Sequence, residues 1–147
     1  MSGEIKKVVN DMKELISKLT SKSKKKYITD NERKTTDFTG SRIEECLIMS
    51  GNEIVSSSTN YRPIMIDIWK TMRPEQIRQT STFNFKLTKE NGIKGFRWCS
   101  DINMSFRNKN ANKTLDEIVN MVKVNRMSLN IAIKLENDKL VYYKIDS

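Results

Sequence analysis

The side chains to test first for catalysis are cysteine, aspartate and glutamate, because histidine is absent from this chain. Without histidine, the commonest general base and a frequent zinc ligand are missing. A cysteine nucleophile needs a lowered pKa and a partner base. Cys46 lies in an apolar run, so we expect it in the core. Cys99 lies beside Trp98 on the polar face of an expected strand, so we expect a partly exposed thiol without a catalytic role.

The carboxylates and glycines do not form a catalytic or phosphate-binding motif either. Glu44 and Glu45 are adjacent on an expected strand and therefore point to opposite faces. Nothing in the spacing of Asp67 and Asp101 selects them as a pair for magnesium. The five glycines are scattered singly and match neither a Walker loop nor a dinucleotide-binding loop. We therefore expect a protein that is not an enzyme and that uses no metal or cofactor.

Basic residues outnumber acidic residues by 27 to 18, and the excess is concentrated in two blocks. Residues 1–34 hold ten basic and five acidic residues, and residues 69–113 hold ten and three. Such concentration is typical of a surface that meets phosphate groups. Lysine, asparagine and isoleucine are all abundant, which is also typical of AT-rich genomes such as those of many viruses and phages. Coding bias therefore accounts for part of the lysine excess.

The second basic block is also the most aromatic part of the chain. Its aromatic residues are Phe83, Phe85, Phe96, Trp98 and Phe106, and its basic residues include Lys86, Lys89, Lys94, Arg97, Arg107, Lys109 and Lys113. Lysine and arginine bind phosphates without sequence specificity, and an exposed aromatic ring can stack on an unpaired base. A sheet must bury one face, so we expect these rings to lie in the core. The opposite face, with Lys86, Arg97 and Arg107, is then expected to bind phosphates.

The hydrophobic pattern predicts an antiparallel sheet built from hairpins, because short alternating runs are separated by turn residues. The expected strands are residues 42–49 with 54–57, 64–69, 83–87 with 96–106, and 127–135 with 140–145. Pro74 predicts a short helical turn after it. The sequence from Thr114 to Glu117 resembles a capping box and predicts a helix that runs to about Val124. One late helix packed on an antiparallel sheet belongs to the α+β class.

Three segments are expected along the chain. Residues 1–20 predict an amphipathic helix, residues 21–41 a basic and polar linker, and residues 42–147 the α+β body. The apolar stripe of the helix consists of Ile5, Val8, Met12, Leu15 and Leu19. The helix is too short to be stable alone, so we expect the stripe to mediate self-association, with packing on the body or on lipid as open alternatives. In the linker, Lys24, Lys25 and Lys26 are expected to grip a polyanion.

The sequence contains neither an apolar leader nor a membrane-spanning stretch, so we expect an intracellular location, in the cytoplasm, the nucleus or a virion. The expected function is non-enzymatic nucleic-acid binding, with RNA favoured, by a homo-oligomer that has a structural or assembly role of the kind viruses use. Two alternatives stay open. One is a matrix-type adaptor that binds anionic membrane with the same basic surface, and the other is a small enzyme of unrecognised type.

Overall fold

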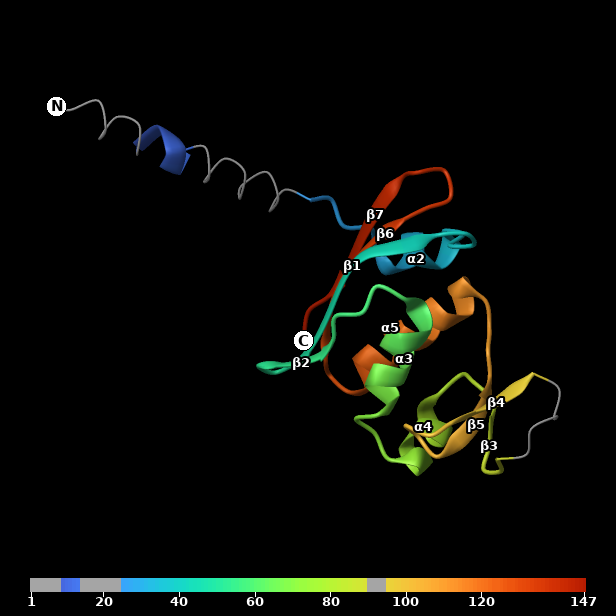
Figure 1. Ribbon diagram of the computed structural model, residues 1–147. Coiled ribbons are helices and arrows are strands. Elements are labelled where there is room, and N and C mark those ends of the chain that lie inside the picture. Colours follow the sequence, from blue (N-terminus) through green and yellow to red (C-terminus); the bar gives the residue numbers. More distant parts are fainter. Residues whose placement is uncertain (1–8, 14–24, 90–94) are drawn as a thin grey trace.

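The computed structural model describes residues 9–13, 25–89 and 95–147. Its body contains a four-stranded sheet with the order β2-β1-β6-β7 and a three-stranded sheet with the order β3-β5-β4. Figure 1 shows helices α3 and α5 side by side between the two sheets. Helices together with antiparallel sheets confirm the expected α+β class.

The large sheet consists of two hairpins joined through their inner strands. β1 (Arg42–Ser50) pairs with β2 (Glu53–Ser56), and β6 (Ser128–Lys134) pairs with β7 (Leu140–Ile145). β1 also pairs with β6, which brings the two ends of the body together. Three cross-strand rows cover its inner face: Ile43, Ile133 and Val141; Cys46, Ile131 and Tyr143; Ile48, Leu129 and Ile145. These two hairpins confirm the predicted pattern.

Helix α3 (Tyr61–Trp69) occupies a segment for which the alternation of isoleucines predicted a strand at 64–69. That prediction was wrong. The buried residues are Ile64, Met65, Ile68 and Trp69, and this spacing is one face of a helix rather than one face of a strand. Pro63 lies in the first turn, where its missing N–H leaves no intrahelical hydrogen bond unmade. The next helix, α4 (Pro74–Thr80), confirms the helical turn predicted after Pro74.

Helix α5 (Ala111–Val124) begins before the predicted capping box at Thr114. Its N-cap is Asn110, whose side-chain oxygen accepts a hydrogen bond from the backbone N–H of Lys113 at 2.9 Å. Thr114 is buried, and its hydroxyl donates to the backbone carbonyl of Asn110 at 2.9 Å. The capping-box prediction was wrong because asparagine caps a helix as well as threonine does. The predicted end at Val124 and the buried apolar stripe are confirmed.

Residues 27–41 belong to the folded body, so the prediction of a linker over residues 21–41 was wrong for this stretch. Tyr27 pairs with Tyr142 at the edge of β7, and the short helix α2 (Asp30–Thr35) follows. Arg33 and Phe38 are 5% and 2% exposed. The polar composition concealed this docking, because one buried arginine and one buried phenylalanine produce no periodic pattern.

Arg33 anchors α2 to α5 and to the large sheet. Its guanidinium donates hydrogen bonds to Asp116 at 2.7 Å and to Asp30 at 3.1 Å. The hydroxyl of Tyr143 also donates to Asp30, at 2.8 Å. These contacts hold the pKa of Asp30 well below its usual range, first through the bond from Tyr143 and further through Arg33. The charge of Arg33 is therefore already paired within the fold.

We expect acid to weaken this anchor. A carboxyl group whose pKa is lower in the folded state stabilises the fold above its unfolded pKa of about 4. That stabilisation is lost as the pH falls toward the folded pKa. The free energy of unfolding, measured with urea at stepwise pH, should therefore decline from about pH 4 downward. Asp30→Asn should show a smaller decline than the exposed control Asp101→Asn, and identical declines would contradict the role of Asp30.

The small sheet consists of β3 (Phe85–Lys86), β4 (Phe96–Cys99) and β5 (Met104–Arg107). β4 and β3 both pair with β5, so the predicted hairpin between residues 83–87 and a single strand 96–106 was wrong. The chain reverses at residues 100–103, where Asn103 has a φ of 53°. Cys99 pairs with Met104 across this turn. Odd-numbered residues of β4 therefore share a face with even-numbered residues of β5. The alternating apolar pattern is thus shifted by one residue at the turn.

Residues 9–13 are helical, and in Figure 1 they lie away from the two sheets. Met12 is 58% exposed and Val9 is 45% exposed. The other residues of the predicted self-association stripe, Ile5, Val8, Leu15 and Leu19, lie outside the described residues. Within the part of the chain that the structure describes, no helix has the length and apolar character needed to cross a membrane.

Candidate nucleic-acid interface

The small sheet rests on a buried aromatic cluster around Trp69. Trp69 is fully buried, and its ring lies edge-on to Phe83, Phe85 and Phe106 at centroid distances of 5.5, 5.1 and 5.0 Å. Edge-to-face pairs at this separation add to the stabilisation that burial of the rings provides. The expectation that aromatic rings of this block lie in the core is confirmed for these three phenylalanines.

A buried carboxylate holds this cluster in place. Glu117 of α5 is fully buried and accepts four hydrogen bonds. Trp69 Nε1 donates at 3.1 Å, the backbone N–H and the hydroxyl of Thr82 each donate at 3.0 Å, and the hydroxyl of Ser81 also donates. The carboxylate thus fixes both the tryptophan under the sheet and the segment that leads into β3.

The outer face of the small sheet carries the other two aromatic rings of the block. Cross-strand pairing places Phe96 opposite Arg107, and Trp98 opposite Ser105, which in turn pairs with Lys86. Directly opposed residues share one face of a sheet. Phe96 and Trp98 are therefore on the same face as Lys86 and Arg107, and both rings are half-buried. The prediction that these two rings are core residues was wrong, because the turn at 100–103 moves them to the opposite face from Phe106.

Three cations contact these two rings. Lys86 Nζ lies 4.8 Å and Arg107 Cζ 5.5 Å from the ring centroid of Phe96. Lys89 Nζ lies 5.2 Å from the ring centroid of Trp98. A cation this close to an aromatic face is attracted by the ring quadrupole. We call the five residues Phe96, Trp98, Lys86, Lys89 and Arg107 the outer cluster.

Gly95 makes room for Arg107 in the outer cluster. It has a φ of 78°, a conformation that residues with a side chain rarely adopt. A Cβ atom at this position would lie 3.0 Å from Nε of Arg107. The glycine therefore permits both the turn into β4 and the position of the guanidinium over Phe96.

Three cations at the small sheet, Lys86, Lys89 and Arg97, form no ion pair with a carboxylate among the described residues. Among the described residues, the ion pairs are formed by cations of α2, β1, α5, β6, β7 and the end of α3. None of these ion pairs includes Lys86, Lys89 or Arg97. The side chains of Lys86, Lys89 and Arg97 are exposed, so the sheet presents positive charge to solvent.

The remaining predicted phosphate-binding residues are distributed over other surfaces. Arg97 pairs with Phe106 and so lies on the opposite face from Lys86 and Arg107, which corrects the prediction that these three share a face. Lys109 donates a hydrogen bond from Nζ to the carbonyl of Thr82 at 2.8 Å and lies over the ring of Phe83.

Lys25, one of the predicted residues of the basic linker, lies on the large sheet instead. Lys25 Nζ is 4.9 Å from the ring centroid of Tyr142, and Lys26 is exposed beside it. Lys24 and Lys94 lie outside the described residues. The predicted basic surface is therefore divided. Among the described residues, Lys86, Lys89 and Arg107 gather around two half-buried rings of the small sheet, whereas Lys25 lies over the ring of Tyr142 on the large sheet.

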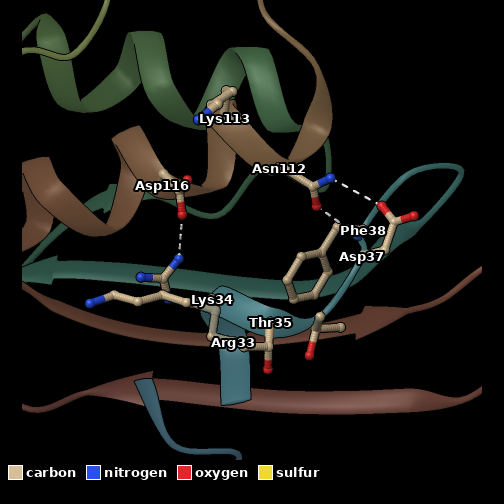
Figure 2. A pocket seen from close by; sticks show the side chains of 9 residues that line it. Arg33, Lys34, Thr35, Asp37, Phe38, Asn112, Lys113 and Asp116 are labelled. Carbon is tan, nitrogen blue, oxygen red and sulfur yellow. Dashed lines mark hydrogen bonds and ion pairs between the residues drawn. The ribbon is translucent and has the colours of Figure 1, made fainter. Parts of the chain in front are cut away.

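A shallow hollow of about 280 Å³ lies between α5 and the segment that follows α2. Figure 2 shows Asn112 at its edge, where the side-chain amide donates to Asp37 at 3.0 Å and accepts from the backbone N–H of Phe38 at 2.7 Å. The exposed Lys113 lines the hollow, but so do Asp37 and Asp116. Arg33 and Lys34 line the hollow as well, but both are already paired with aspartates, which weakens the attraction of the hollow for an anion.

The cysteines are not suited to nucleophilic chemistry. Burial, and secondly the charge of Asp67, raises the pKa of Cys46 to about 12. Cys99 is 7% exposed, so the prediction of a partly exposed thiol was wrong. Cys99 faces the core because it pairs with Met104, on the same face as Phe106. Over residues 9–13, 25–89 and 95–147, no three carboxylates or cysteines converge in a group that could hold a metal ion.

Comparison of the chain with protein-family models, with curated proteins and with solved structures finds no match.

Proposed function

We propose that the protein binds nucleic acid through the outer face of the small sheet and acts as a binding protein rather than as an enzyme. The observation that supports this proposal is the outer cluster, in which two half-exposed aromatic rings lie among three cations. Cations on an exposed surface bind phosphates and release condensed counterions. Aromatic rings beside them offer a second, uncharged contact that nucleic acid can use and that a simple polyanion cannot.

The two lysines of the outer cluster carry charge that is available to a ligand. Lys86 and Lys89 make no ion pair within the described residues, whereas Arg33 is held between two aspartates. Exposed cations without a partner interact with ions in solution, and paired cations contribute much less. The proposed binding surface is therefore smaller than the number of basic residues in the chain would suggest.

A salt titration tests the proposal. Affinity for a single-stranded oligonucleotide of roughly 16 nucleotides should fall linearly with the logarithm of the salt concentration. Each phosphate contact contributes about 0.7 to the slope, so Lys86→Ala with Lys89→Ala should reduce it by about 1.4 and weaken binding about 25-fold at 0.1 M salt.

The matched control is Lys134→Ala with Lys139→Ala, which removes the same charge at the β6–β7 turn, away from the small sheet in Figure 1. This control should change the slope much less than the change at the outer cluster does. An equal loss in both double variants would show that only net charge matters. Undetectable binding of any nucleic acid at low salt would refute the proposal, and binding to phosphatidylserine vesicles alone would assign the surface to anionic lipid.

A further inference from the structure

We infer that the outer cluster selects single-stranded over double-stranded nucleic acid, with unpaired bases stacked on Phe96 and Trp98. This inference rests on the proposed function and identifies the class of ligand. It changes the role of these two rings, because the alternating sequence pattern placed them in the core and left recognition to phosphate contacts alone.

The spacing of the two rings fits successive bases of an extended strand. Phe96 and Trp98 are two residues apart on β4 and project from the same face. The rise of a β-strand places such residues roughly 7 Å apart, about twice the 3.4 Å step between stacked bases. A strand of nucleic acid that is stretched beyond the stacked form can therefore place one base on each ring.

The cations lie where the phosphates of such a strand would run. Lys86 and Arg107 flank Phe96, and Lys89 flanks Trp98. Lys86 and Lys89 are exposed, so their ammonium groups can move from ring to phosphate. An exposed cation–π contact is weaker than the stacking of a base on an aromatic side chain. Exchange of the first contact for the second is therefore favourable, and the displaced ammonium gains a phosphate partner.

A duplex cannot use the rings in this way. Its bases are already stacked on each other, and exposing one to a protein ring requires unpairing and unstacking it. A duplex would therefore meet only the cations of the outer cluster and would bind with the lower affinity of phosphate contacts. The difference in affinity between the single strand and the duplex therefore measures the contribution of the two rings to binding.

The chain carries a fluorescent reporter for this contact. It has two tryptophans, of which Trp69 is fully buried and Trp98 is half-exposed. A base stacked on Trp98 should quench its emission, while Trp69 serves as an internal reference. The experiment titrates the full chain with a single-stranded oligonucleotide and with the blunt duplex of the same length, both at about 0.1 M salt.

The single strand should quench the emission and bind at least about tenfold more tightly than the duplex. Trp98→Ala and Phe96→Ala should each weaken single-strand binding about 5- to 150-fold, the loss expected for one stacked base. Duplex binding should stay the same in both variants. The control Leu87→Ala, which removes an exposed apolar side chain of the same region, should change neither affinity.

Trp98→Phe is the control for a folding defect in Trp98→Ala, because it keeps an aromatic ring on the outer face. It should retain most of the single-strand affinity and lose the quenching. Equal affinity for single strand and duplex, or unchanged single-strand affinity in Trp98→Ala, would overturn the inference. Salt-dependent binding without discrimination would still leave the proposed function standing, whereas the absence of all nucleic-acid binding would remove both.

Discussion

Glu117→Gln is expected to lower the free energy of unfolding by about 2–4 kcal/mol, although the two side chains have nearly the same shape. Oε2 of Glu117 accepts from Trp69 Nε1 and from the hydroxyl of Ser81, and Oε1 accepts from the backbone N–H and the hydroxyl of Thr82. A glutamine amide has one oxygen and one NH₂ group. Whichever way it is oriented, its NH₂ group faces an N–H that cannot accept a hydrogen bond.

Urea unfolding of Glu117→Gln beside Glu136→Gln provides the measurement. Glu136 is exposed, so its substitution removes the same charge without disturbing a buried donor. The control should change stability by less than about 0.5 kcal/mol. If the two variants were equally stable, the four hydrogen bonds to Glu117 would carry no net stabilisation.

Trp69→Ala is expected to cost about 3–5 kcal/mol, a large part of the total stability of a domain. The side chain is fully buried and contacts Phe83, Phe85 and Phe106, so truncation leaves a cavity beneath the small sheet. It also removes one of the donors to Glu117. The same urea series should show a lower midpoint, and a change below about 1 kcal/mol would contradict the packing role.

Trp69→Phe separates the hydrogen bond from the packing. It keeps a ring in the cluster and removes the indole N–H, so its cost should be smaller than that of Trp69→Ala. Combined with Glu117→Gln, it should give a loss smaller than the sum of the two, because without the indole N–H the glutamine can direct its NH₂ group to that side and keep its oxygen toward Thr82. Additive losses would indicate that the indole and the carboxylate act independently.

The large sheet and the late helix could be predicted because each shows its own regular pattern. Leu129, Ile131 and Ile133 alternate strictly, and the turn at Asn137 and Asp138 separates them from the returning strand. Hairpins of this kind are local, so a short window of sequence contains the information. Helix α5 has an apolar stripe of helical period and was predicted to its last residue, although not to its first.

The segment around α3 could not be assigned from its pattern alone. Ile64 and Ile68 are compatible both with a strand and with one turn of a helix, and Ile66 between them favoured the strand. Burial of Met65 and Trp69 beside them decides for the helix. Short apolar runs are ambiguous in this way because a segment of nine residues is compatible with either a strand or a helix in its length and flanking residues.

The candidate site was predicted in composition but not in geometry. The sequence identified the aromatic and basic block, yet it assigned Phe96 and Trp98 to the wrong face because no pattern marked the turn at 100–103. Nothing in the sequence around Glu117 indicates that it is buried, since the groups that donate hydrogen bonds to it come from α3 and from the segment after α4. Contacts between distant segments of this kind are set by the packed structure and leave no local period.

The pairing of β1 with β6 also determines when the protein can finish folding. Arg42 of β1 pairs with Lys134 of β6, so nearly the whole body separates the two partners along the chain. During synthesis, the β1–β2 hairpin leaves the ribosome with one edge unpaired until residue 134 has followed. Closing such a long loop is entropically costly, and folds with many non-local pairings form slowly. We therefore expect nascent chains of this protein to expose an unpaired edge of β1 until the residues of β6 have been synthesised.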